Sequence, residues 1–143
     1  KEYDAKDLSN AENRTPEETN IGNRKRYKTD PRITKSYIKS KGYICEYNSK
    51  HITFTANRSK NNYVEGHHLI PMNAQKDFDI NIDRTENLVS LCPVCHRQVH
   101  LGTNDEIKKV LKKLFQLKQV NLQGLGISIT FEDLYNKYYV KIK

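Results

Sequence analysis

Two stretches of the sequence decide the fold, and each contains a pair of histidines. They are Glu65-Gly66-His67-His68-Leu69-Ile70-Pro71 and Glu86-Asn87-Leu88-Val89-Ser90-Leu91-Cys92-Pro93-Val94-Cys95-His96-Arg97-Gln98-Val99-His100. The β-branched and aromatic residues of 63–70 predict a strand, and residues 88–91 predict a second. Pro93 favours the first turn of a helix. Residues 71–87 show neither the period of a helix nor that of a strand, so we expect a long loop there. A long loop inside a small domain is usually functional. The predicted order is strand, long loop, strand, helix.

The region before these stretches carries start and stop signals for a helix. Asp30 suits the N-cap, Pro31 the first helical position, and Gly42 the end of the helix. After it we expect two short strands, at residues 43–45 and 52–55. Beyond the second stretch, Thr103-Asn104-Asp105-Glu106 has the spacing of a capping box and predicts another helix. A closing helix is predicted at residues 131–139.

The length of 143 residues fits one domain, because domains cluster at about 100–150 residues. We expect residues 1–23 to be an acidic linker or a lead-in from an upstream domain, with residues 1–20 either a solvated segment or a short helix. Residues 24–143 then form the domain itself, with its motif region at 43–101 and a helical tail at 103–143. A first residue other than Met favours a piece of a longer protein, in which an upstream domain supplies specificity.

The composition indicates a thin core and a polyanionic partner. Only 36% of the residues are hydrophobic, Trp is absent, and 25 Lys+Arg against 17 Asp+Glu leave a net charge of +8. No apolar run approaches the roughly 18 residues of a membrane span, and no signal peptide is apparent. We therefore expect a cytoplasmic protein rather than a membrane protein or a secreted disulfide scaffold. The charge favours nucleic acid as the partner.

The three cysteines are an odd number, which argues against a disulfide framework and favours a metal site. Cys92 and Cys95 have the spacing of a zinc-ligand pair, and Cys45 is followed six positions later by His51. A Cys3His set of these four residues would hold zinc and help to stabilise a thin core. The alternatives are three buried free thiols, or a fourth ligand supplied by Asn48 or water instead of His51.

The remaining four histidines fall in two clusters. Neighbours on a strand point to opposite faces, so one of His67 and His68 can bind a metal while the other stays off it. His96 and His100 lie four apart and share one helix face. We expect a second metal site with a catalytic histidine beside it; the alternative is one extended zinc site. Glu65 shares a strand face with His67, where it either orients an imidazole or is a solvated acid.

Together, these strings resemble the HNH endonuclease family, and the resemblance spans residues 43–101. It is closest to the branch with a structural zinc that is common in restriction enzymes, including modification-dependent ones. The resemblance implies an α+β fold whose core is a ββα-metal (His-Me) finger with a structural zinc knuckle, flanked by helices at both ends.

The same resemblance implies a role for each motif residue. His68 matches the general base that activates water, whereas His67 and His96 match ligands of a catalytic divalent ion. His100 matches an additional ligand of that ion. Asn87 matches the central Asn, which holds the loop rather than taking part in the chemistry.

The predicted activity is hydrolysis of phosphodiester bonds in duplex DNA by a single-metal mechanism. We expect the chain to be the nuclease domain of a restriction or defence enzyme, and a homodimer is one option for its assembly. His67 stands where many family members have Asp, and an imidazole set favours Mn2+, Ni2+ or Zn2+ over Mg2+. The alternatives are a non-catalytic zinc module that binds DNA, a nuclease of a phage or mobile element, and RNA as the substrate.

Positive charge is concentrated just before the motif region, where residues 24–41 hold eight cations and one acid. We expect these cations to contact phosphates, with a solubilising face as the alternative. The expected DNA-binding residues are Arg24, Lys25, Arg26, Lys28, Arg32, Lys35 and Arg97. Tyrosines near the C-terminus are expected in packing rather than in stacking on nucleobases; they are Tyr135, Tyr138 and Tyr139.

Overall fold

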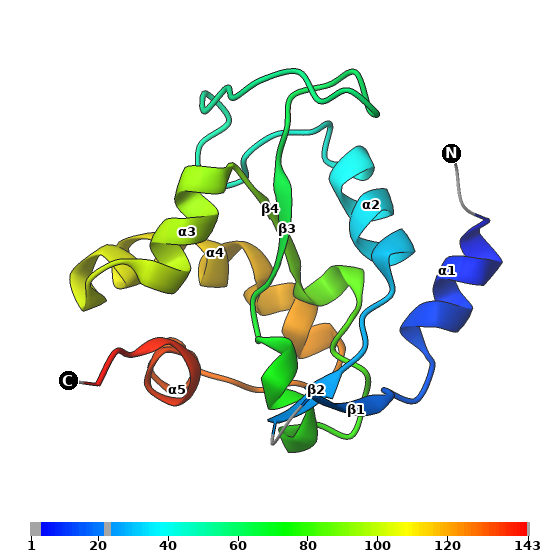
Figure 1. The fold of residues 1–143 in the computed structure, drawn as a ribbon. Helices are drawn as coiled ribbons and strands as arrows, with labels where there is room; N and C mark the ends of the chain where they lie inside the picture. Colours follow the sequence, from blue (N-terminus) through cyan, green and yellow to red (C-terminus); the bar gives the residue numbers. More distant parts are fainter. Residues whose placement is uncertain (1–3, 22–23, 143) are drawn as a thin grey trace.

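The two histidine-containing stretches form a ββα unit in the computed structural model of the chain (Figure 1). Strands β3 (Glu65–His68) and β4 (Leu88–Leu91) pair antiparallel, with Glu65 opposite Leu91 and His68 opposite Leu88. Helix α3 (Pro93–Leu101) follows directly, with Cys92 as its N-cap. The α+β class and the order strand, loop, strand, helix are confirmed.

The structure describes most of the chain. The described residues are 4–21 and 24–142, and the side chains of residues 21, 24 and 25 are outside the description.

The long connection between β3 and β4 is less irregular than predicted. It contains two short 3-10 helices, η1 (Met72–Asp77) and η2 (Thr85–Asn87). Neither has the apolar period of an α-helix, and for this reason the sequence indicated only a loop. Side-chain hydrogen bonds hold the segment between them: Gln75 accepts from the Ile82 amide and donates to the Ile80 carbonyl.

Helix α2 (Pro31–Ser40) lies on one side of the β3–β4 pair and α3 on the other (Figure 1). As predicted, Asp30 caps α2 by accepting from the Arg32 amide, and Gly42 follows the helix with a φ of +75°. Contact with β3 is close: a Cβ placed on Gly66 would lie 2.1 Å from the Cγ2 atom of Thr34. Glycine at this position is what allows the helix to approach the strand.

The chain before α2 folds as a short helix, which was one of the two predicted options, and a hairpin that the sequence did not predict. Helix α1 (Ala5–Glu12) is followed by the antiparallel strands β1 (Glu18–Ile21) and β2 (Arg24–Tyr27). The expected boundary at residues 23 and 24 falls within this hairpin. A carboxylate oxygen of Glu12 accepts from the Thr85 amide at 2.8 Å, so α1 is attached to the loop of the ββα unit. Connection to an upstream domain stays a prediction.

The C-terminal helices complete the fold. Helix α4 (Asn104–Gly124) begins at the predicted cap, where Thr103 accepts from the Glu106 amide. The predicted closing helix is present as α5 (Phe131–Leu134) continued by the π-helix η3 (Tyr135–Tyr139). Among the described residues, no helix has both the length and the apolar character to cross a membrane.

The two strands expected at residues 43–45 and 52–55 are wrong. Residues 41–64 form an extended loop whose only described pairing is an isolated bridge between Thr55 and Asn62. The Asn62 side chain accepts from the Thr53 amide and donates to the Tyr43 carbonyl. Backbone hydrogen bonds from the Tyr63 amide to the Phe54 carbonyl and from the Ala56 amide to the Asn61 carbonyl close a local turn here instead of building a regular strand.

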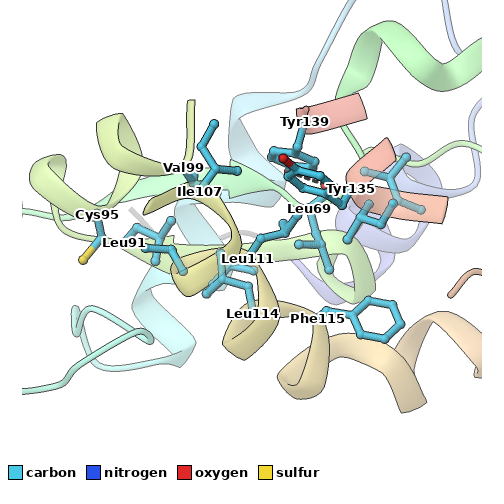
Figure 2. Close-up of a cluster of buried hydrophobic side chains, with 14 of the residues drawn as sticks. Leu69, Leu91, Cys95, Val99, Ile107, Leu111, Leu114, Phe115, Tyr135 and Tyr139 are labelled. Carbon is cyan, nitrogen blue, oxygen red and sulfur yellow. Dashed lines mark hydrogen bonds between the residues drawn. The ribbon is translucent and has the colours of Figure 1, made fainter. Parts of the chain in front are cut away.

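One hydrophobic core joins the ββα unit to α4 (Figure 2). Leu69, just after β3, and Leu91 of β4 pack with Val99 of α3 and with Leu111 and Leu114 of α4, and all five are fully buried. Cys95 lies at one edge of this cluster and Tyr139 at another. The core therefore supports both the cysteines at one edge and the histidine side chains beside Tyr139 at the other.

Candidate active site

The three cysteines and His51 lie together at one end of the core. Cys45 and His51 come from the loop after α2, and Cys92 and Cys95 from the start of α3. The Nδ1 atom of His51 is 3.9, 3.6 and 3.4 Å from the Sγ atoms of Cys45, Cys92 and Cys95. All four ligand atoms lie within 4.8 Å of one another, and the cysteines are buried free thiols.

This cluster suits zinc. With Zn–S bonds of about 2.3 Å and Zn–N bonds of about 2.0 Å, a tetrahedral site places ligand atoms about 3.5 Å apart. The distances from His51 are close to that value. Burial first, and then Cys92 and Cys45, raise the pKa of the Cys95 thiol well above its usual range. Three such sulfurs can ionise together only beside a cation, which zinc supplies.

A second cluster contains His67 of β3 and His96 and His100 of α3. The ring centroid of His67 is 5.2 Å from that of His96 and 4.9 Å from that of His100, and the latter two are 5.0 Å apart. Each residue offers a ring nitrogen within 4.8 Å of the others. Burial, and then the neighbouring imidazoles, hold the pKa of His67 well below its usual range. A neutral His67 is able to bind a cation.

The buried hydroxyl of Tyr139 fixes the orientation of His67. Its oxygen donates to the Leu69 carbonyl, so it can only accept from the Nε2–H group of His67, which is 2.8 Å away. The proton of His67 is thereby held on Nε2, and Nδ1 keeps its lone pair. Burial raises the pKa of Tyr139 far above its usual range, so the phenol stays protonated.

Glu65 holds His96 in the same way. Its Oε1 atom accepts from Nδ1 of His96 at 3.0 Å, and its Oε2 atom accepts from the Tyr63 hydroxyl at 2.8 Å. Burial alone would raise the pKa of Glu65, but the bonds from His96 and Tyr63 outweigh it and lower the pKa. Of the two interpretations left open by the sequence, the contacts favour the orienting carboxylate. The Nε2 atom of His96 is left for a ligand.

His68 faces away from the histidine cluster and contacts Asp83. The Nε2 atom of His68 is 2.8 Å from Oδ1 of Asp83, whose side chain is completely buried. The carboxylate accepts from Nε2, so Nδ1 is the ring nitrogen that is not bonded to Asp83. A histidine held by a carboxylate in this way can serve as a general base through its other nitrogen.

Asp83 also connects the active site to the N-terminal elements. Its Oδ2 atom accepts from the Arg14 guanidinium at 2.9 Å and from the Asp30 amide at 2.6 Å. Burial alone would raise the pKa of Asp83, but the hydrogen bonds from His68 and Asp30 outweigh it and keep the pKa below its usual range. The carboxylate therefore stays ionised beside His68.

Asn87 joins the two ends of the loop. Its Oδ1 atom accepts from the Ile70 amide at 2.8 Å, and its Nδ2 atom donates to the Ile70 and Ile82 carbonyls at 2.9 Å each. The side chain is fully buried. These contacts position the end of β3 that carries His68.

The expected DNA-binding residues are dispersed. Lys28 pairs with Glu17 at 3.0 Å and Arg32 with Asp30 at 2.6 Å, whereas Lys35 is exposed on α2. Exposed positions are also found for Arg26 on β2 and Arg97 on α3. The side chains of Arg24 and Lys25 lie outside the described part of the chain.

Sequence reasoning missed Asp83 and the contact made by Tyr139. Asp83 lies in a stretch with no period, and Tyr139 was expected only to pack. Their contacts span 15 and 72 positions, and no local pattern signals such pairs. The one available signal for Asp83 was an acid within a long loop that was itself expected to be functional.

Comparison with known proteins agrees with this geometry. Residues 45–101 match the model of the HNH endonuclease family. Over 99 residues the chain is 34% identical to the type IV methyl-directed restriction enzyme EcoKMcrA of Escherichia coli (strain K12). That alignment covers 69% of this chain and 31% of the relative, so the chain spans about a third of the relative's length.

Proposed function

Residues 45–101 form an HNH endonuclease domain, and from this premise we propose that the chain is a metal-dependent DNA endonuclease of the restriction type. The proposed reaction is hydrolysis of phosphodiester bonds in duplex DNA with one catalytic divalent cation. The restriction role is supported by the relative, whose name describes a methyl-directed restriction enzyme.

The observation that carries the proposal is the hydrogen-bonding pattern of three histidines. His67, His68 and His96 each have one ring nitrogen bonded to a partner within the protein. The remaining nitrogen of each is therefore available for a ligand or for a proton. A purely structural zinc module, which needs only the cysteine cluster, gives no reason for this arrangement.

His67, His96 and His100 are the residues that would hold the catalytic ion. When bound, a divalent cation supplies charge neutralisation at the scissile phosphate and at the leaving 3′ oxygen. Three imidazoles suit Ni2+, Zn2+ or Mn2+ better than Mg2+, and which cation serves is part of the test. Glu65 keeps the His96 ring in place, and Tyr139 does the same for His67.

His68 is the proposed general base. Its Nδ1 atom accepts a proton from the attacking water, and the imidazolium that forms is stabilised by the Asp83 carboxylate on the opposite nitrogen. Asp83 touches neither water nor phosphate in this scheme and acts as a positioning residue. Asn87 maintains the loop geometry that brings Asp83 to His68.

The experiment compares the wild-type chain with His68→Ala on modified and unmodified plasmid DNA in Mg2+, Mn2+ or Ni2+. We expect the variant to keep its zinc and its fold, with a stability loss of about 1–3 kcal/mol from the missing bond to Asp83, while cleavage falls by about 10²–10⁴-fold, the usual contribution of a general base. Full activity of His68→Ala would show that the base is misassigned. Degradation of RNA in preference to DNA would change the substrate.

The same experiment tests the rival class, a non-catalytic zinc module that binds DNA. That class requires one zinc per chain and no cleavage in any of the three cations.

Specificity for modified DNA is a separate part of the proposal, and we expect residues beyond this chain to contribute to it, because the chain spans only about a third of its relative.

A further inference from the structure

A wide groove lies between α2 and the loop that leads into β3. Its volume is about 1030 Å3. The residues that line it are Lys35, Ser36, Ile38, Lys39, Ser40, Tyr43, Ala56, Arg58, Ser59, Asn61, Asn62, Tyr63 and Val64. None of the catalytic or zinc-binding assignments made above accounts for this groove.

The lining of the groove is basic. Lys35 and Lys39 come from α2 and Arg58 comes from the opposite wall, and no described lining residue is acidic. Short neutral groups such as Ser36 and Ser59 stand between these cations. Cations interspersed with hydroxyl and amide groups are the side chains that typically contact the phosphates of DNA.

One wall of the groove is joined to the histidine cluster. Tyr63 lines the groove, and its hydroxyl donates to Glu65, which in turn holds His96. The Tyr63 ring stacks on Phe54 with a centroid distance of 4.8 Å, although Phe54 itself is 59% exposed. The wall is therefore fixed in position relative to the proposed metal ligands.

The other wall is joined to the proposed general base. The Asp30 amide at the start of α2 donates to Asp83, which holds His68. At a rise of 1.5 Å per residue, α2 carries the chain about 13 Å from Asp30 to Lys39. The groove thus begins within a few nucleotides of the position where His68 would act.

We propose that this groove binds the sugar–phosphate backbone of the DNA strand that flanks the scissile phosphate. This inference rests on the proposed nuclease function and names the surface that aligns its substrate. Lys35 and Arg58 contact phosphates from opposite walls, and the hydroxyl groups add hydrogen bonds that carry no sequence information.

The test is a charge-matched pair of double variants. Lys35→Ala with Arg58→Ala removes two cations from the groove, and Lys109→Ala with Lys112→Ala removes two exposed cations from α4, which does not line it. Affinity for a labelled duplex is measured by fluorescence anisotropy across a salt series without added divalent cation. Zinc content and unfolding midpoints verify that each variant is folded.

We expect the groove variant to bind DNA roughly ten- to a hundredfold more weakly than wild type. The slope of log affinity against log salt concentration should decrease by the amount that about two phosphate contacts contribute. The α4 variant should change the affinity by less than about threefold, since charges remote from the DNA are screened. Ser36→Asp, which adds an acid to the groove, should weaken binding in the same direction. Equal losses in the two double variants, or none in the groove variant, would overturn the inference.

Cleavage by the wild-type chain separates this inference from the function on which it rests. Cleavage that is retained by wild type and by the groove variant alike contradicts the groove and leaves the nuclease intact. Absence of cleavage by wild type in every cation contradicts the nuclease, whatever the groove variant binds.

Discussion

At the scale of single residues, hydrogen bonds to ring nitrogens decide which histidine can do which task. His67 and His68 are neighbours on β3, yet one donates to a tyrosine hydroxyl and the other to a carboxylate. A carboxylate strengthens an imidazole as a proton acceptor, because it stabilises the imidazolium. A neutral phenol fixes the orientation of a ring without that effect. This difference supports assigning proton transfer to His68 and metal binding to His67.

The role of Asp83 can be separated from its contribution to stability. Asp83→Asn turns an acceptor toward His68 into a group that also donates, so we expect kcat to fall about 10–100-fold, as is usual for an outer partner of a catalytic group. Arg14→Met is the matched control, because it removes a different partner of the same carboxylate. Both variants should lose about 1–3 kcal/mol of stability.

Steady-state cleavage and urea unfolding measure the two effects. We expect kcat of Arg14→Met to stay within about threefold of wild type, since Asp83 still holds His68. Equal kcat for the two variants would mean that Asp83 acts only by attaching the N-terminal segment.

At the scale of elements, the approach of helices to the β3–β4 pair places the site. Helix α2 contacts β3 at Gly66, and α4 passes beneath η2, where the buried Lys118 amino group donates to the Thr85 carbonyl at 3.2 Å. Lys118 also lies 4.5 Å from the centroid of the Tyr37 ring of α2. These two contacts set the positions of α2 and of the loop, and thereby of Asp83.

Gly66→Ala should separate α2 from β3, because the new Cβ would lie 2.1 Å from the Cγ2 atom of Thr34. Overpacking of this kind costs about 1–3 kcal/mol. Thr34→Ser deletes that Cγ2 atom, so adding it to Gly66→Ala should restore at least half of the loss. Gly124→Ala is the control, since no atom lies within 4 Å of its added Cβ. Urea unfolding of the four variants provides the comparison, and additive losses in the double variant would disprove this contact as the cause.

Lys118 makes the free energy of unfolding depend on pH in a direction that can be predicted. Burial lowers its pKa to about 8, from 10.5. Below pH 8 the folded protein must bury a charged amine. Between pH 8 and 10.5 the unfolded chain binds more protons than the folded chain, so this residue makes stability rise with pH there.

Lys118→Met removes the free-energy cost of burying a charged amine, but it also removes the hydrogen bond to the Thr85 carbonyl. We expect a gain of about 1–2 kcal/mol at pH 7. The advantage of the variant over wild type should shrink as the pH rises from 8 to 10, as measured by urea unfolding at each pH. An advantage that is constant with pH would indicate that folding does not lower the pKa of the Lys118 amine, which would then stay charged in the folded and the unfolded chain alike.

At the scale of the whole molecule, the cluster of three cysteines and His51 would substitute for a larger core when it holds zinc. Cys45 and His51 lie in a loop of residues 41–64 that contains an isolated bridge and no named helix or strand, whereas Cys92 and Cys95 belong to the ββα unit. An ion held by both parts would tie the loop to the unit. The same loop provides one wall of the groove, so the cluster also supports the proposed DNA surface.

Loss of one zinc ligand should therefore unfold the loop and weaken the whole domain. We expect Cys95→Ser to lose its zinc and on the order of 5 kcal/mol of stability, because metal binding energy in small zinc domains is folding energy. His96→Ala is the matched control on the same helix. It should keep the zinc at the cysteine cluster and most of the stability but lose cleavage.

Metal analysis of each purified variant, followed by urea unfolding, provides the measurement. A Cys95→Ser variant that folds as stably as wild type would disprove the stabilising role of the cluster.

Short-range patterns in the sequence determined the ββα order, the cap of α2 by Asp30, the start of α4 at Thr103 and the two closely spaced pairs Cys92–Cys95 and His96–His100. These features depend on spacing and on local backbone chemistry, which the sequence states directly. The odd cysteine count and the resemblance to the HNH family predicted the other members of the two clusters. Tertiary structure alone decided that residues 43–45 and 52–55 are not strands, because the Asn62 side chain bonds to the Tyr43 carbonyl and the Thr53 amide, and the Phe54 carbonyl accepts from Tyr63 in a local turn. It also decided the partners of the histidines. Asp83 and Tyr139 reach His68 and His67 only through packing of segments far apart in the chain, and such contacts leave no periodic trace in the sequence.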